Sequence, residues 1–178
     1  MAERLRAPAM AWRRWRRLSG LERRLLLQAC LCLPLVALGL RGLGLRRLHV
    51  LVGRAAPGRA RLAAGPASVT WAQAAARSVQ AAARLGPRPA TCLERSWVLW
   101  WFLRRAGIAG ELVIGVRKCG DRLAAHAWVE LDGVPLNDAP DVAQHFPPFP
   151  APVTSTLAWS SPAVAEATAK TPAQAGGN

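Results

Sequence analysis

The chain has 178 residues, enough for one domain with a hydrophobic core but too few for two once its tails are subtracted. Hydrophobic residues make up 52% of it and charged residues 19%, a balance that excludes global disorder. The net charge of +14, from 24 basic and 10 acidic side chains, would suit nucleic acid or an anionic membrane. No helix-turn-helix, zinc-finger or RNA-binding signature accompanies the charge, and codon composition alone can enrich Arg and Ala. We therefore expect no nucleic-acid partner.

The cysteines and histidines show no spacing typical of a metal site. Cys30 and Cys32 lie in an apolar run, where we expect small buried side chains. The sequence predicts no metal and no cofactor, and its cysteine pattern does not require an oxidising compartment, so we expect a cytoplasmic protein. The full set is Cys30, Cys32, Cys92, Cys119, His49, His126 and His145.

Residues 1–52 form a basic and apolar segment that predicts a pair of helices. Ser19 and Glu22 have the capping-box spacing ahead of an apolar run, and a second helix follows the first. Pro34 should kink or divide the first helix. The apolar run over 25–40 falls short of the roughly 20 residues that cross a bilayer. We favour a soluble pair of helices or one that docks on a partner, with membrane association and a targeting segment as the alternatives.

Composition divides the rest of the chain. Residues 53–68 are rich in Gly, Ala, Pro and Arg and are typical of a linker. An Ala-rich helix over 69–85 opens a core domain that we place at 69–146. Residues 147–178 are rich in Pro, Ala and Thr without periodicity, which predicts a disordered tail.

A strongly apolar run over 96–103 predicts a buried central helix. Thr91 and Glu94 have the capping-box spacing, which places Cys92 at the first helical position. Exposed N–H groups and the positive end of the helix dipole favour a thiolate there, and the same N–H groups suit a developing oxyanion. From the helix start alone, a buried structural cysteine explains Cys92 equally well, so its partners decide.

Three strand-like segments follow this helix, and two of them supply those partners. His126 lies within the second, over 124–131, and Asp138 ends the third, over 134–138. A cysteine nucleophile needs a base to take its proton and a third group to orient the imidazole. We therefore predict Cys92 as nucleophile, His126 as base and Asp138 as orienter.

Other candidates are better explained without a catalytic role. Asp141 is the fallback orienter if Asp138 points elsewhere. We expect Cys119 to be a bystander in a turn and His145 to be a surface residue. Four tryptophans are expected in the core rather than in a binding site, namely Trp97, Trp100, Trp101 and Trp128.

The core domain carries four distinctive motifs, which are Cys92-Leu-Glu-Arg-Ser, Leu112-Val-Ile-Gly-Val-Arg117, His126-Ala-Trp-Val-Glu and Leu136-Asn-Asp138. Together they resemble the B protein of lasso peptide biosynthesis, a transglutaminase-like leader peptidase. The expected fold is α+β, with a transglutaminase-like, papain-like core of helices on a small antiparallel sheet, preceded by the helical pair. The resemblance also assigns the triad to Cys92, His126 and Asp138, and it identifies no oxyanion side chain.

The resemblance implies cleavage of a ribosomally made precursor between its leader and its core, followed by ring closure by a separate ATP-dependent cyclase. Residues 1–68 lack the strands of the precursor-recognition domain that some B proteins carry, so this chain resembles the split form, whose recognition protein is separate. The expected partners are the precursor peptide, that protein and the cyclase, with membrane contact through the N-terminus. Two alternatives remain: an acyl transferase or transglutaminase using the same triad, and a membrane-associated adaptor with a vestigial triad.

The hairpin register decides whether His126 and Asp138 share one face of the sheet. A two-residue Asp132-Gly133 turn would set His126 opposite Ala139. A three-residue turn would set it opposite Asp138, and Gly133 would take the left-handed position. We therefore predict the three-residue turn, with Asn137 facing away from His126.

Overall fold

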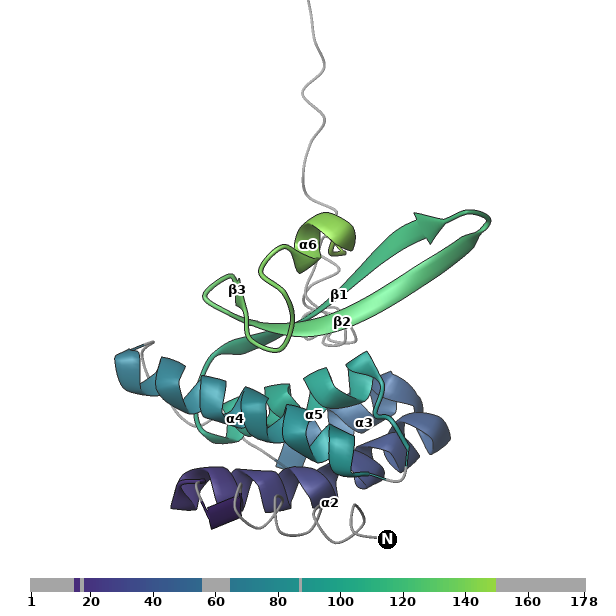
Figure 1. Cartoon of the computed structure of the whole chain (residues 1–178). Coiled ribbons are helices and arrows are strands. Elements are labelled where there is room, and N and C mark those ends of the chain that lie inside the picture. The colour runs from purple at the N-terminus through teal and green to yellow at the C-terminus, as the bar shows by residue number, and fades with distance from the viewer. Residues whose placement is uncertain (1–14, 17, 56–64, 87, 150–178) are drawn as a thin grey trace, which may run out of the picture.

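The computed structural model describes residues 15–16, 18–55, 65–86 and 88–149 (Figure 1). Within the described residues, the four helices α2 to α5 precede a three-stranded antiparallel sheet of order β1-β2-β3 and a short helix. Their bounds are α2 Gly20–Gly42, α3 Gly44–Ala55, α4 Pro66–Leu85, α5 Cys92–Arg105, β1 Gly110–Cys119, β2 Arg122–Leu131, β3 Val134–Pro135 and α6 Val142–His145. The expected α+β fold, with N-terminal helices and a small antiparallel sheet, is confirmed.

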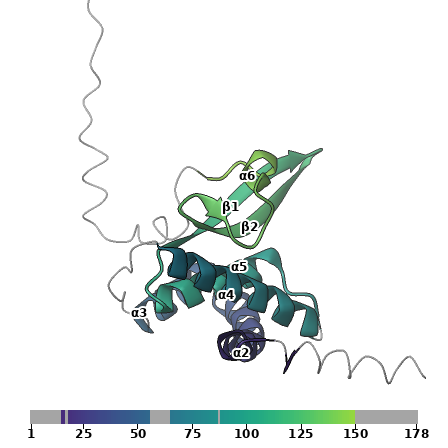
Figure 2. The same cartoon turned by 60° about the vertical axis from the view of Figure 1, so that its left-hand side comes forward.

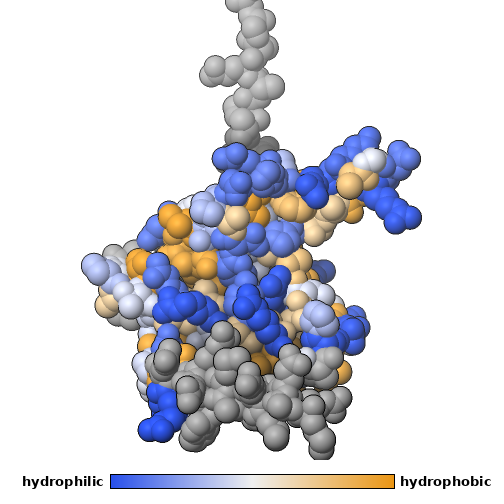
Figure 3. Space-filling view, in the orientation of Figure 1, coloured by the Kyte–Doolittle hydropathy of each residue, from blue (hydrophilic) through white to orange (hydrophobic). Residues whose placement is uncertain are grey.

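The elements stack in layers. In both views α2 lies farthest from the sheet, α4 and α5 form the middle layer, and α6 covers the opposite face of the sheet (Figures 1 and 2). The far end of the β1–β2 hairpin projects beyond the helices and is largely hydrophilic (Figure 3). The middle helix α5 therefore has protein on two sides, which is why its sequence is apolar nearly all round.

One main hydrophobic core joins the helices to the sheet. It includes Leu25 of α2, Val79 of α4, Leu99 of α5 and Val129 of β2. The predicted N-terminal pair thus contributes a buried face of α2 to the same core. A smaller cluster around Trp128 lies on the α6 side of the sheet. Of the tryptophans expected in the core, Trp97, Trp100 and Trp128 are buried and Trp101 is half-buried.

Both predicted helix starts are present. The Ser19 hydroxyl accepts from the Glu22 amide while the Glu22 carboxylate accepts from the Ser19 amide, and α2 begins there. Pro34 does not divide this helix, which is continuous from Gly20 to Gly42. Cys30 is exposed rather than buried, and it lines a cavity between α2 and the end of α4.

The hairpin turn differs from the prediction. Leu131 pairs with Val134 and Glu130 with Pro135, so the loop is the two-residue Asp132-Gly133. Both loop residues have positive φ, 51° and 77°, the conformation of a type I′ turn, whose twist matches that of the flanking strands. The three-residue turn was therefore wrong, and the route by which Asp138 reaches the sheet is different.

The core extends slightly past its predicted end. The Val116 amide donates to the Pro147 carbonyl at 3.1 Å, and the Phe149 amide donates to the Ile114 carbonyl at 3.1 Å. This segment adds a short antiparallel pairing to the outer edge of β1. Most of the predicted linker, 56–64, and the remainder of the predicted tail, 150–178, lie outside the described residues.

Candidate active site

His126 and Asp138 form the shortest side-chain contact around the sheet. The Nε2 atom of His126 lies 2.6 Å from Oδ2 of Asp138, and the two side chains are 22% and 25% exposed. The other carboxylate oxygen, Oδ1, accepts from the Ala139 amide at 3.0 Å. Because a carboxylate can only accept, Nε2 carries the proton, and Nδ1 is the nitrogen left to act as a base.

Cys92 is the first residue of α5. The Thr91 hydroxyl accepts from the Glu94 amide at 3.2 Å, and the Glu94 carboxylate accepts from the Thr91 amide at 2.9 Å. The half-buried thiol therefore lies at the start of a capped helix, next to backbone N–H groups that have no acceptor within the helix.

The packing of α5 on β2 brings Cys92 toward His126. Ser96, one turn after Cys92, donates its hydroxyl to the Ala127 carbonyl at 2.9 Å. At the other end of the helix Leu103 packs on Gly110, which pairs with Leu131. The helix thus runs in the same direction as β2, so the turn before Ser96 lies toward the residues that precede Ala127.

The three predicted site residues are not all joined by hydrogen bonds. His126 and Asp138 are in contact, whereas Cys92 makes no hydrogen bond to the His126 ring. Hydrogen bonds of this kind often form only when substrate is bound. The structure therefore places the thiol at the helix start beside the strand of the His126–Asp138 pair, with the last contact open.

Asn137 explains how Asp138 reaches His126 in spite of the two-residue turn. Its Oδ1 accepts from the Val129 amide at 2.8 Å, in the place that a backbone carbonyl would occupy if β3 continued. Its Nδ2 donates to the Ser96 hydroxyl at 2.9 Å. The Leu136 amide still donates to the Val129 carbonyl at 2.8 Å, so the backbone leaves the strand register after Leu136, and the rule of alternating faces no longer applies to Asp138.

No role was predicted for Ser96, and Asn137 was predicted only to face away from His126. Ser96 is a fully buried polar residue within an apolar helix, and a buried hydroxyl needs a partner. A serine within an apolar helix was therefore the sequence feature that could have pointed to this hydrogen-bond network. As predicted, Asn137 faces away from His126, since its amide joins α5 to β2.

Aromatic rings enclose the other side of the imidazole. The Phe146 ring centroid lies 5.0 Å from that of His126, and the Trp128 ring lies 6.3 Å away. Gly115, which pairs with His126, lies so close to the Phe146 backbone that a Cβ atom would overlap it. Glycine at this position therefore allows the 146–149 segment to reach the edge of the sheet.

Charge at the α5 start is fixed by an ion pair. Nη2 of Arg88 lies 2.6 Å from Oε1 of Glu94, whose side chain is 6% exposed. Burial alone would raise the pKa of Glu94. Hydrogen bonds from Arg88 and the Thr91 amide, with the charges of Arg88 and Arg41, outweigh burial and hold the pKa below its ordinary value.

An open groove of about 540 Å³ runs beside the His126–Asp138 pair. One wall is α4, which contributes Gln73, Arg77, Gln80 and Arg84, and the other is the segment from Leu136 to Asp138. Asp138 lines this groove, whereas His126 and Cys92 do not, and its two arginines and two glutamines stand among apolar residues.

The remaining candidates lie apart from this site. Asp141, the fallback orienter, contacts His145 at 3.1 Å on the exposed surface of α6. Cys119 is exposed at the far end of β1. Among the described residues no group of three His, Cys, Asp or Glu side chains is arranged to hold a metal ion.

Comparison with known proteins gives one match. A family model described as the transglutaminase-like superfamily matches residues 30–150, about two thirds of the chain. The match begins inside α2 and ends at the segment that pairs with β1. No curated protein and no solved structure matches the chain.

Proposed function

Because the chain belongs to the transglutaminase-like superfamily, we propose that it is a cysteine peptidase that removes the leader from a lasso peptide precursor. The observation that carries the chemistry is the 2.6 Å contact between His126 and Asp138, beside the helix that begins at Cys92. The four motifs that resemble the lasso B protein support the substrate class.

The proposed reaction uses the free nitrogen of the imidazole. Nδ1 of His126 takes the Cys92 proton, and the thiolate attacks the scissile carbonyl to give a tetrahedral oxyanion. Asp138 accepts from Nε2–H and stabilises the imidazolium that forms. The imidazolium then protonates the leaving amine, a thioester remains on Cys92, and water activated by Nδ1 hydrolyses it.

The start of α5 supplies donors for the oxyanion. In the first turn the Glu94 amide is bound by the Thr91 hydroxyl and the Arg95 amide by the Thr91 carbonyl. The amides of Cys92 and Leu93 precede them and have no acceptor within the helix. We assign these two backbone N–H groups to the oxyanion, in a role that needs no side chain.

We propose that the groove beside Asp138 holds the precursor near the cut. Its arginines suit acidic or carbonyl-rich stretches of an extended peptide. A separate recognition protein would bind the leader and deliver it, and a separate ATP-dependent cyclase would use the released core. The proposed location is the cytoplasm, with association at the membrane.

Mass spectrometry of a precursor incubated with the recognition protein tests the proposal. Wild-type enzyme should release the leader, whereas Cys92→Ala and Cys92→Ser should fold normally and lose roughly 10³-fold or more of the activity, since an alcohol stays protonated near neutral pH. Cys119→Ser is the matched control and should cleave like the wild type. Unchanged cleavage by Cys92→Ala would end the assignment.

The same incubation separates hydrolysis from acyl transfer. The thioester can be attacked by an amine as readily as by water, so a competing amine is added. An amine adduct as the main product would identify an acyl transferase. Equal alkylation rates at Cys92 and Cys119 would indicate an inactive triad and favour the adaptor.

A further inference from the structure

The outer face of α2 carries a stripe of exposed leucines. Leu27, Leu31, Leu35 and Leu38 are 59%, 65%, 58% and 67% exposed, and their spacing places them on one side of the helix. The opposite side of α2, including Leu25, Ala29 and Leu33, is buried in the core. A soluble protein gains nothing from four neighbouring exposed leucines, so this stripe is a candidate binding surface.

Arginines stand at both ends of the stripe. Arg24 lies one turn before Leu27 and Arg41 one turn after Leu38, and both are exposed. Residues 1–52 hold eleven arginines against two glutamates, so they carry +9 of the chain's net charge of +14. Glu22, the acidic residue of α2, is engaged by the Ser19 cap and lies 3.4 Å from Arg77.

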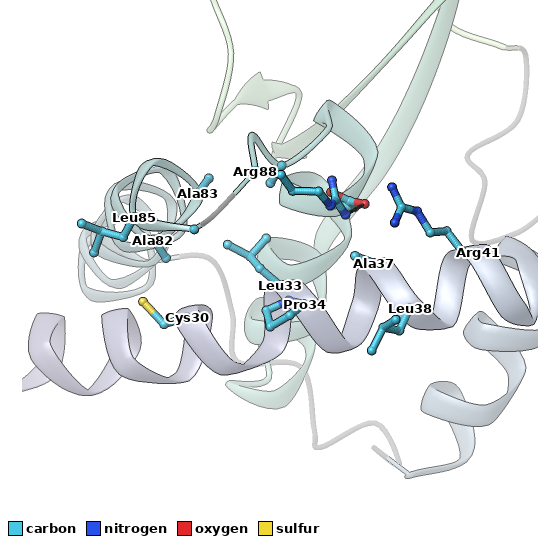
Figure 4. Close-up of a pocket in the computed structure, with 13 residues that line it drawn as sticks. Cys30, Leu33, Pro34, Ala37, Leu38, Arg41, Ala82, Ala83, Leu85 and Arg88 are labelled. Carbon is cyan, nitrogen blue, oxygen red and sulfur yellow. Dashed lines mark hydrogen bonds and ion pairs between the residues drawn. The ribbon is translucent and has the colours of Figure 1, made fainter.

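An apolar cavity of about 470 Å³ adjoins the stripe. It lies between α2, the end of α4 and the start of α5, and Leu33, Pro34, Leu38, Ala82 and Leu85 line it (Figure 4). Arg41 stands at its edge with the guanidinium turned toward Arg88 (Figure 4). Arg88 is already bidentate on Glu94, whereas Arg41 makes no hydrogen bond to the described residues. The charged residues that line this apolar recess are Arg41, Arg88 and Glu94, which leave a net positive charge. An apolar recess with a net positive edge matches a lipid, which has an acyl chain and an anionic headgroup.

We propose that the outer face of α2 and this cavity bind the surface of an anionic phospholipid bilayer. The leucines enter the boundary of the acyl chains, and Arg24 and Arg41 contact lipid phosphates. This inference specifies the surface and the lipid class of the membrane association proposed above, and it does not depend on the peptidase chemistry. Charge favours lipid over a protein partner, because a stripe bounded by arginines at both ends is complementary to a uniformly anionic surface.

The helix lies on the membrane rather than across it. By length and composition α2 is the one helix among the described residues that could cross a bilayer, although its apolar core run alone had seemed too short. Capping at Ser19 and continuation through Pro34 extend it to 23 residues. Crossing would pull its buried face out of the core. Docking through the outer face keeps that core, and it leaves the sheet with His126 and Asp138 on the side away from the membrane (Figures 1 and 2).

Vesicle flotation with the full-length protein tests the proposal. The protein should float with phosphatidylglycerol–phosphatidylcholine vesicles and stay behind with phosphatidylcholine alone, and added salt should weaken binding. The double variant Leu31→Ser, Leu38→Ser should bind roughly tenfold more weakly or worse, and Arg41→Gln should lose a smaller part. Leu123→Ser and Arg122→Gln, at the exposed end of the hairpin, are the matched controls and should bind like the wild type.

Two exposed cysteines give a second readout. Cys30 lies beside the stripe and Cys119 on the hairpin. Anionic vesicles should slow alkylation of Cys30 several-fold and leave Cys119 unchanged. Equal rates at Cys30 with and without vesicles would overturn the proposal, as would undiminished flotation of the double variant.

Activity distinguishes this proposal from the peptidase assignment. The double variant should cleave soluble precursor at the wild-type rate, and Cys92→Ala should still float with anionic vesicles. If the double variant instead floats normally but no longer responds to the recognition protein, the stripe is a protein interface and the lipid proposal is wrong.

Discussion

At the scale of single residues, the site depends on which nitrogen of His126 faces Asp138. Nε2 faces the carboxylate, so the nitrogen free to act as the proposed base is Nδ1, the one closer to the backbone. A base held close to its strand can serve only a nucleophile beside that strand. The start of α5, joined to β2 through Ser96 and Asn137, provides this position.

Substitutions of His126 and Asp138 should reduce activity by different amounts. His126→Ala removes the base and should lower kcat by roughly 10²- to 10⁴-fold. Asp138→Asn should cost less, because the amide oxygen can still accept from Nε2–H, although its NH₂ group then faces the Ala139 amide in place of Oδ1. Single-turnover cleavage of the precursor measures both. A larger loss from Asp138→Asn than from His126→Ala would mean that the orienter is misassigned.

At the scale of elements, the sequence predicted the starts of helices better than the turn that connects two strands. Capping boxes at Ser19 and Thr91 placed two helix starts because a cap is a local pattern. The turn type was missed because it was inferred from the need to align His126 with Asp138. That inference assumed that β3 continues as a strand, and no local pattern shows that a side chain, Asn137, replaces a backbone acceptor.

The Glu94–Arg88 pair should make the start of α5 sensitive to acid. The pKa of Glu94 is held below the ordinary value of 4.5, so its contribution to stability is complete above that value and is lost as pH falls through the lower, folded-state pKa. Glu94→Gln should lower the free energy of unfolding by about 1–2 kcal/mol at pH 7, a value kept small because Arg88 is 36% exposed. The difference from wild type should shrink below pH 4.5. Denaturant titration at several pH values checks this, with the exposed Glu111→Gln as the control.

Gly115 should be intolerant of a side chain. A Cβ atom there would overlap the Phe146 carbonyl and contact Trp128, both backed by the sheet. Gly115→Ala should displace the 146–149 segment, destabilise the fold by about 1–3 kcal/mol and lower activity as Phe146 leaves the His126 ring. Thermal unfolding and cleavage rates measure both effects. Gly42→Ala is the control, since its Cβ would meet nothing, and equal behaviour of the two variants would contradict the proposed packing.

At the scale of the whole molecule, the layers separate two surfaces. The sheet side carries the paired His126 and Asp138 and the groove, and the α2 side carries the leucine stripe (Figures 1 and 2). The sequence predicted a feature of each surface. The candidate site residues lie in the motifs of the core domain, and the apolar and basic residues lie in 1–52. Which face of α2 is buried could not be read from the sequence, because the helix is apolar on both sides and only packing against α4 and α5 decides.

The open groove beside Asp138 predicts that the protein alone binds the precursor weakly. An open groove buries too little of a flexible peptide to offset the conformational entropy that the peptide loses on binding. A recognition protein that holds the leader raises the local concentration of the cleavage site, which should lower the apparent Kd for labelled precursor by roughly 10²-fold or more. Fluorescence anisotropy with and without that protein measures the change. Arg84→Gln, in the groove wall, should weaken both titrations, whereas Arg122→Gln on the hairpin should weaken neither. Equal affinity in the presence and absence of the recognition protein would show that the enzyme selects its precursor unaided.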